Sequence, residues 1–291
     1  MLARLVGLIA LLLLPAVALA AETRCPEHFL NGQAPDLTNP KLTARTRPLC
    51  YSAFAVLHSG TTRTPLWSAE HLTRDRVEAA RGMVRVNTFH ADPNLSPGER
   101  AELSDYARSG FDRGHMAPSG DMPDDQSQDE SFSLANMIPQ NPDNNRHLWE
   151  RIETAVRNLT LREGELYVVT GPIFRGENLQ ALKGRVLVPT ELFKAIYDPK
   201  RNGAAAYVVP NAAGSEWRQV SISELQQLTG IDVFPGLPQS VKESAMPLPK
   251  PGERGRRRRE RVERQPSGPA PRNDPDAVER VRRKLMGEEL R

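Results

Sequence analysis

The sequence contains very little cysteine. Of 291 residues only Cys25 and Cys50 are cysteines, and neither belongs to a C-x-x-C motif. Two cysteines cannot supply a four-cysteine zinc site. The six histidines are scattered, with no H-x-x-x-H pair on one element, which argues against a zinc hydrolase.

Long hydrophobic runs are also missing beyond the first 20 residues. Leu5 to Leu14 is strongly apolar, but this run has only about half of the ~20 residues that a membrane span needs. Arg4 precedes it and Ala18-Leu19-Ala20 follows it, which is the pattern of a cleaved signal peptide. The alternative is a membrane anchor. We predict a signal peptide over residues 1–20, export to the periplasm or the extracellular medium, and no stable membrane insertion after cleavage.

Export would place the two cysteines in an oxidising compartment. There the simplest interpretation is a Cys25–Cys50 disulfide, and the alternative is two unpaired thiols. A loop of this length would contribute on the order of 3–4 kcal/mol in the chain-entropy model.

The chain is also not basic over most of its length. The whole chain carries +3, and residues 250–291 alone carry +6, from 14 Lys and Arg against 8 Asp and Glu. Residues 1–249 are therefore at −3. Bulk charge does not indicate nucleic-acid binding by this body, so any electropositive surface on it must be local.

Composition divides the mature chain into two parts. Residues 21–240 are predicted to form one globular domain. Residues 241–291 form a basic tail rich in Pro and Arg that has too few apolar residues to fold alone and is predicted to be mostly disordered, with a short helix near its end. Its run "RGRRRRER" predicts either an electrostatic tether for a polyanion or a solvated tail.

Extended segments and helices alternate irregularly in the domain, which indicates an α+β fold. Apolar or extended segments cover 49–60, 64–73, 82–92, 110–118, 130–140, 165–174, 185–198 and 204–211. The clearest helix follows residue 143, where Leu148, Ile152, Val156 and Leu159 form an apolar stripe. Asp143 or Asn144 is predicted to cap its start, and Gly164 lies beyond its end.

A histidine and this helix carry the most informative spacing. His115 ends the short strand of "FDRGH"; a loop, a second strand and then the helix follow. Strand, loop, strand and helix is the layout of a ββα-metal nuclease site, where a histidine and a helix side chain meet over one cavity.

Several segments in order resemble the DNA/RNA non-specific endonuclease family over roughly residues 48–237. They are "SGFDRGHMAPSGDM", "LANMIPQNPDNNRHLWERIE", "YVVTGPIF", "VPTELFKAIYD" and "YVVPN". The resemblance implies a ββα-metal (His-Me finger) nuclease fold with a mostly antiparallel central sheet flanked by helices. It also implies cleavage of DNA and RNA with Mg²⁺, or Mn²⁺ in its place, giving 5′-phosphate ends. Members commonly form homodimers, although no segment here indicates one.

The resemblance also implies roles for individual residues. His115 matches the general base, Asn145 the direct protein ligand of the metal, and Glu153 the carboxylate that organises metal-bound water. Asn136 matches a polar residue that supports the site, and Arg113 and Arg157 match two arginines of the motif and the helix.

Arg85 and Asp112 are two further candidate site residues. Relatives often carry a basic residue 25 to 29 positions before the histidine, where this sequence has His90. Arg85 is the nearest upstream arginine and is therefore predicted as a second phosphate contact. Asp112 is predicted to hold the motif turn.

The residue types suit phosphodiester hydrolysis. A neutral histidine with a pKa near ~6.5 can accept a proton from water at neutral pH. Mg²⁺ prefers oxygen ligands, and arginines can hold phosphate oxygens. Asn145 and Glu153 are eight residues apart, about 80° around a helix, so both can border one cavity.

Other interpretations remain open. Glu153 and Arg157 could form an ion pair on a solvated helix face. Trp149 is predicted to pack in the core rather than stack on a base, and His147 to be exposed. Since nothing in the sequence reads base edges, no base specificity is expected. The alternative function is a nucleic-acid-binding protein on a catalytically decayed nuclease fold.

Overall fold

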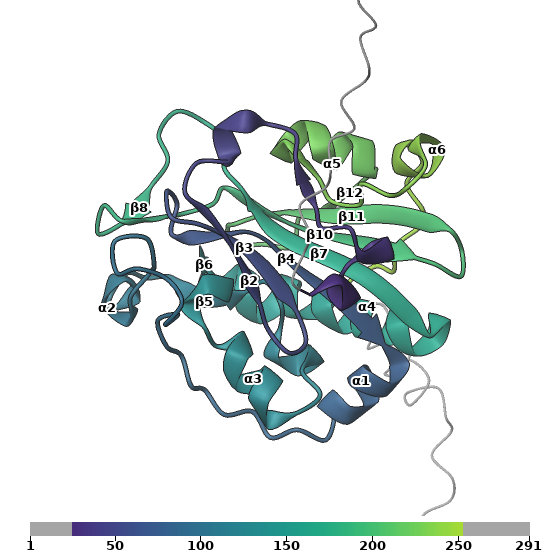
Figure 1. Ribbon diagram of the computed structural model, residues 1–291, viewed down its shortest axis with the longest axis horizontal. Coiled ribbons are helices and arrows are strands. Elements are labelled where there is room, and N and C mark those ends of the chain that lie inside the picture. Colours follow the sequence, from purple (N-terminus) through teal and green to yellow (C-terminus); the bar gives the residue numbers. More distant parts are fainter. Residues whose placement is uncertain (1–24, 253–291) are drawn as a thin grey trace, which may run out of the picture. The chain divides into compact units, whose positions relative to one another are not determined.

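The computed structural model describes residues 25–252 (Figure 1). The predicted signal peptide, the arginine-rich run and the short helix expected near the end of the tail lie outside the described residues. Within residues 25–252, no helix combines the length and the apolar character needed to cross a bilayer.

A seven-stranded sheet forms the centre of the folded unit. Its strands follow the order β12-β11-β10-β7-β4-β3-β2, and all neighbours are antiparallel. They are β2 (Thr46–Cys50), β3 (Ala55–Ser59), β4 (Thr64–Thr73), β7 (Glu165–Ile173), β10 (Glu191–Asp198), β11 (Gly203–Pro210) and β12 (Arg218–Val220). This sheet confirms the predicted α+β class with an antiparallel centre.

Helices cover the two faces of the sheet. Figure 1 shows α5 (Ile222–Thr229) and α6 (Gln239–Glu243) on one side, and α1 (Arg74–Ala80), α3 (Asp125–Ser131) and α4 (Glu150–Glu163) on the other. Strand β10 serves both faces, because Phe193 packs toward the α5 side and Leu192 toward the α4 side. Alternate side chains of this central strand are therefore buried in two separate cores, which explains its nearly continuous apolar sequence.

Smaller elements complete the described chain. The helix α2 covers Leu103–Tyr106, and the short strand pairs are β1 (Asp36–Leu37) with β13 (Ile231–Asp232), β5 (Asp112–His115) with β6 (Met137–Gln140), and β8 (Ala181–Leu182) with β9 (Val186–Leu187). The single-turn helices are η1 (Pro26–His28), η2 (Leu30–Gly32), η3 (Pro40–Leu42), η4 (Ser119–Asp121) and η5 (Leu134–Asn136), and the π-helical turn η6 covers Asn144–Trp149.

Three extended segments differ from their prediction. Of residues 130–140 only β6 is a strand, because α3 ends at Ser131 and η5 covers Leu134–Asn136. Residues 49–60 are not one strand, because the Tyr51 amide donates to the Phe54 carbonyl and turns the chain between β2 and β3. Residues 82–92 join no strand of the sheet and make a single bridge, from His90 to Ser133. The Val86 amide instead donates to the Gln128 side chain, so a side chain replaces a strand partner here.

The folded unit extends beyond the predicted boundary at residue 240. Helix α6 spans this boundary, and beyond it Met246 and Leu248 are buried in the core that contains α4. The Met246 amide donates to the Ala204 carbonyl, and the Leu248 amide to the Gln219 side chain. Composition did not indicate that residues 241–252 belong to the folded unit, because their few apolar side chains are buried only against the rest of the domain.

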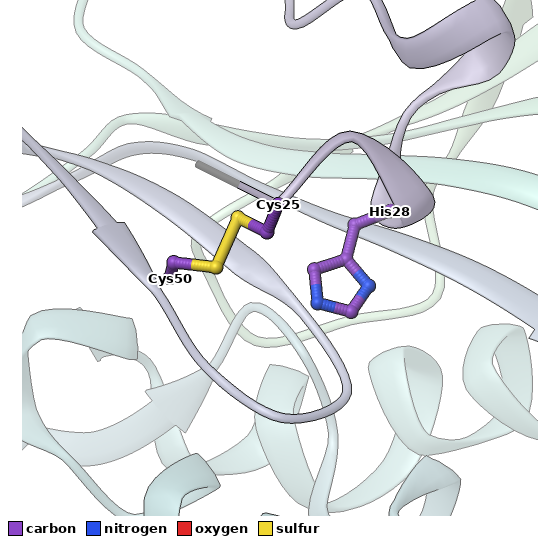
Figure 2. A group of neighbouring side chains, drawn as sticks. All are labelled: Cys25, His28 and Cys50. Carbon is purple, nitrogen blue, oxygen red and sulfur yellow. A yellow bond between two sulfur atoms is a disulfide. The ribbon is translucent and has the colours of Figure 1, made fainter. Parts of the chain in front are cut away.

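The predicted disulfide is confirmed. Cys25, just before η1, is bonded to Cys50 at the end of β2, with 6.0 Å between the Cα atoms (Figure 2). His28 lies beside the bond, and its Nε2 is 2.9 Å from the Tyr51 carbonyl oxygen, to which it donates. Because both sulfurs and this nitrogen are already engaged, the three residues do not present a set of free metal ligands.

Candidate active site

The site is built on the pair β5–β6 and the helix that follows it. His115 is opposite Met137, and Asp112 is opposite Gln140. The chain then enters η6 and α4 with no break between them. Gly114 leaves room for the Gln140 side chain, since a Cβ at this position would lie 1.9 Å from the Gln140 Oε1 atom.

The start of the helix corrects one prediction. Asp143 makes no side-chain cap, and Asn144 does not cap the helix either. The Asn144 side chain is buried; it accepts from Gln140 Nε2 at 2.8 Å and donates to the Pro210 carbonyl at 3.1 Å. Tertiary contacts with β6 and β11 thus hold the first turn, which is a π-turn of the kind that often occurs at functional sites. Gly164 ends the helix with φ 110°, as predicted.

A cleft of about 810 Å³ opens over this unit. It brings together His115, Arg113, Asn145, Glu153, Arg157 and Arg85, all of which were predicted as site residues. Its charged lining consists of five arginines and three carboxylates: Arg85, Arg108, Arg113, Arg146, Arg157, Asp112, Glu150 and Glu153. The cleft wall is thus locally positive, although residues 1–249 are net negative.

His115 lies in an aromatic wall and is only 8% exposed. Its ring is 4.9 Å from the Phe132 ring, edge-on, and 5.8 Å from the Phe89 ring. Its Nε2 is buried and has no hydrogen-bond partner in the described part of the chain. Burial, assisted by Arg85 and Arg113, lowers the pKa of His115 to about 3. The imidazole is therefore neutral, as a proton acceptor must be.

Asp112 orients Asn145. The Asn145 Nδ2 donates to Asp112 Oδ2 at 3.0 Å, and Arg146 donates to both oxygens of the same carboxylate at 2.9 and 2.7 Å. Burial raises the pKa of Asp112, but the bonds from Arg146 and Asn145 outweigh it and hold the pKa below its usual value.

This arrangement fits a hard cation. Asn145 lines the cleft, and its amide nitrogen donates to Asp112, whereas its Oδ1 makes no hydrogen bond within residues 25–252. An amide oxygen beside water and phosphate is a donor set that Mg²⁺ and Mn²⁺ accept.

Glu153 and Arg157 do not pair with each other. Arg157 donates to Asp121 Oδ1 at 2.9 Å and to Thr154 Oγ1 at 2.9 Å. Burial raises the pKa of Glu153 to about 7, although Arg157 and Lys194 act to lower it. The alternative of an ion pair on a solvated helix face is therefore not realised, and Glu153 faces the cleft without a hydrogen-bond partner among the described residues.

A buried polar group that no sequence pattern indicated lies beneath the cleft, on the same face of the sheet. Glu70 is 1% exposed, and neither of its carboxyl oxygens has a hydrogen-bond partner in residues 25–252. Burial, together with Asp121, raises its pKa well above the usual value. Lys194 donates to Thr170 Oγ1 at 2.7 Å nearby. The raised pKa of Glu70 disfavours a negative charge on this carboxyl group beneath the cleft.

Asn136 supports the site from below and does not line the cleft. Its Oδ1 accepts from Ser68 Oγ and from the Ala117 amide, and its Nδ2 donates to the carbonyls of Ala117 and Ser131, all at 2.9 Å. All four of its hydrogen-bonding positions are used. Because Ala117 is two residues beyond His115, this network fixes the backbone that carries the histidine.

The remaining predictions concern the positions of Arg85, Trp149 and His147 relative to the cleft and the core. Arg85 reaches the cleft, with its guanidinium carbon 5.2 Å from the Phe132 ring centre, whereas His90 does not line it. Trp149 is buried in the core beside α4, and His147 is exposed beside Asp143, as predicted for both.

Three charged lining residues escaped prediction: Arg108, Arg146 and Glu150. Arg146 directly follows the predicted metal ligand, and Glu150 lies one turn before Glu153, so helix geometry could have identified both. Arg108 lies in a loop between α2 and β5, and no sequence pattern indicates that it faces the histidine.

A strand pair followed by a helix, with a histidine on the strand and an asparagine at the helix start over an arginine-lined cleft, defines the ββα-metal class of nuclease folds. The chain belongs to the DNA/RNA non-specific endonuclease family, whose profile matches residues 33–240. This confirms the family to which the sequence motifs pointed.

Individual relatives agree with that assignment. The chain is 37% identical over 210 residues to "Nuclease EXOG, mitochondrial" of Danio rerio, covering 64% of this chain and 60% of that protein. It is 34% identical to "Nuclease C1" of Cunninghamella echinulata var. echinulata (65% and 83% covered) and 32% identical to "Nuclease" of Nostoc sp. (75% and 84%). A solved EndoG/EndoGI complex contains a chain with 27% identity and a TM-score of 0.58, covering 68% of this chain and 89% of that one.

Replacing Asp112 tests whether it orients Asn145, the predicted metal ligand. In Asp112→Ala the Asn145 amide loses its acceptor, so we expect Mn²⁺ affinity, measured by isothermal titration calorimetry, to fall about 10–100-fold. Arg146→Ala is the matched control, because it removes the other partner of Asp112 and leaves the bond to Asn145 intact; a much smaller loss is expected. Equal Mn²⁺ affinity in Asp112→Ala and the wild type would contradict this role.

Replacing Glu153 tests its raised pKa in the metal-free protein. Between the unfolded pKa of about 4.5 and the folded pKa of about 7, the folded state keeps a proton that the unfolded state has lost, so stability falls as pH rises. Glu153→Gln removes this loss. Because the side chain is partly exposed to the cleft, we expect the variant to gain about 1–2 kcal/mol relative to wild type between pH 5 and pH 8.

Urea unfolding in EDTA at several pH values measures this difference. Glu150→Gln, an exposed carboxylate of the same helix, is the control and should follow the wild type. A stability difference between Glu153→Gln and wild type that does not change with pH would show that Glu153 keeps an ordinary pKa.

Proposed function

We propose that this protein is an exported, metal-dependent endonuclease that hydrolyses phosphodiester bonds of DNA and RNA without sequence specificity. One observation carries the proposal: a neutral, buried His115 and an Asn145 whose amide nitrogen is bonded to Asp112 border the same arginine-lined cleft. Membership of the family and relatives named as nucleases support it.

The substrate is recognised through its phosphates. The cleft gathers five arginines on a body with net negative charge, so the attraction is local. The guanidinium carbon of Arg113 lies 4.1 Å from the Phe89 ring centre, and this contact holds the guanidinium plane without engaging it in an ion pair. Arginine forks bind the oxygens that every nucleotide shares, which is consistent with cleavage of both DNA and RNA.

His115 removes a proton from the attacking water. The new P–O bond forms as the bond from phosphorus to the 3′ oxygen breaks, and the leaving oxygen takes a proton from solvent, which gives 5′-phosphate and 3′-hydroxyl ends. A pKa of about 3 makes the free imidazole a weak base, because burial, Arg85 and Arg113 all disfavour its charged form. A bound phosphate would offset the two arginines and raise the basicity of His115 when substrate is present.

Asn145 would hold Mg²⁺, or Mn²⁺, through its Oδ1 atom, and Glu153 would accept hydrogen bonds from water in the same cleft. When bound, the cation supplies Lewis-acid stabilisation of negative charge on the phosphate. Arg157, tied to Asp121, contributes a fixed positive charge beside Glu153.

Export is supported by two independent features. Residues 1–20 have the charge, apolar run and small residues of a signal peptide. The Cys25–Cys50 disulfide suits an oxidising compartment such as the periplasm or the extracellular medium.

Plasmid DNA and ribosomal RNA with Mg²⁺ or with EDTA test the activity. We expect the wild type to degrade both only with Mg²⁺, and His115→Ala to lose about 10²–10⁴-fold in rate because the general base is gone. Asn145→Ala should lose activity through weaker metal binding. His147→Ala, an exposed histidine on the same helix, is the control and should cleave like wild type. Full activity of His115→Ala would refute the proposal, and binding without cleavage by wild type would favour the decayed-fold alternative.

A further inference from the structure

Arg108 is placed at the cleft by the loop between α2 and β5. It is seven residues before His115, and its exposed side chain lines the same cleft. The Ser109 amide donates to the Tyr106 carbonyl, and the Phe111 amide donates to Ser109 Oγ. These bonds hold the loop that carries Arg108 as one wall of the cleft.

Arg108 differs from the other cleft arginines in its partners. Arg146 is paired with Asp112 at 2.7 Å, and Arg157 with Asp121 at 2.9 Å. Arg85 donates to Asn87 at 3.0 Å. The Arg108 guanidinium makes no hydrogen bond, ion pair or ring contact with any residue from 25 to 252. A positive charge that the protein leaves uncompensated at a phosphate-binding cleft is available to the ligand.

The backbone of Arg108 supports the same conclusion. Its φ is 59°, in the left-handed region that favours glycine, and Gly110 follows with φ 81°. A large side chain in this conformation carries a steric cost that a glycine would avoid. Nothing within the fold uses the guanidinium, so folding gives no reason for an arginine here.

The surroundings of Arg108 suit a nucleotide beside the one that is cleaved. Leu103, Ala107 and Phe111 line the same wall, and Leu103 is 43% exposed. These apolar groups can pack against a sugar or a base, and they offer no side-chain hydrogen bonds that could distinguish one base from another. The wall therefore combines one free cation with an apolar surface.

We propose that Arg108 binds a phosphate that flanks the scissile one, so that the preferred substrate is a continuous polynucleotide strand. This inference rests on the proposed nuclease function. It assigns Arg108 to substrate binding rather than to the chemical step, and it predicts that its effect appears in KM and in the salt dependence of binding.

A 20-nucleotide single-stranded DNA tests the inference with the full chain and Mg²⁺. For Arg108→Gln we expect KM to rise about tenfold while kcat stays within twofold of wild type. The slope of log(kcat/KM) against log[salt] should become about 0.7 shallower, as expected when one phosphate contact to a single strand is lost. Arg108→Lys should keep most of the slope, since it keeps the charge.

Two further variants separate charge from structure. Arg108→Gly relieves the left-handed backbone and should match Arg108→Gln in KM without a lower melting temperature. Arg74→Gln, an exposed arginine outside the cleft, should behave like wild type. Unchanged KM and an unchanged salt slope in Arg108→Gln would overturn the inference. A loss of kcat/KM in Arg108→Lys that equals the loss in Arg108→Gln and comes from a lower kcat would also overturn it. If wild type itself does not cleave the strand, the proposed function fails, and that outcome is distinct because no variant then has a rate.

Discussion

The carboxylate of Asp112 joins the two halves of the site. It lies at the start of β5 and accepts hydrogen bonds from Asn145 and Arg146 at the start of the helix. Three residues further along the same strand is His115. The hydrogen bond between Asp112 and Asn145 therefore fixes the position of the asparagine relative to His115. It also determines that the oxygen of the Asn145 amide, and not its nitrogen, is free for a ligand. Without it the strand and helix could pack correctly and still present the wrong atom to the cleft.

The site contains buried polar groups without hydrogen-bond partners among residues 25–252, and such groups are rare in protein cores. His115 Nε2 and both oxygens of Glu70 are buried without hydrogen-bond partners in the described chain. Such groups cost stability, and they tend to concentrate where ionisation must be controlled. Here burial lowers the pKa of His115 and raises the pKa of Glu70 and Glu153, while the positive charges of Arg157 and Lys194 act in the opposite direction on both carboxyl groups. The carboxyl groups and the arginines are thus parts of one electrostatic arrangement.

Local patterns and motif spacing predicted the parts of the fold that depend on local chemistry. The apolar stripe from Leu148 to Leu159 and the strand ending at His115 needed only periodicity and the motif. The prediction failed where contacts between residues distant in the sequence determine the local structure. Asn144 bonds to Gln140 and to the Pro210 carbonyl instead of capping its helix, and a side chain from α3 takes the place of a strand partner for residue 86. Arg108 is the clearest case, because a loop residue without a motif becomes part of the cleft only through the fold.

We propose that the Asn145 amide oxygen, oriented by Asp112, holds the divalent cation. The most direct measurement is anomalous X-ray diffraction from crystals soaked in Mn²⁺, for wild type and for Asn145→Ala. We expect one strong anomalous peak in the cleft, about 2.0–2.2 Å from Asn145 Oδ1, which disappears in the variant. A cleft peak that is bound by other residues, or that persists unchanged in Asn145→Ala, would contradict it.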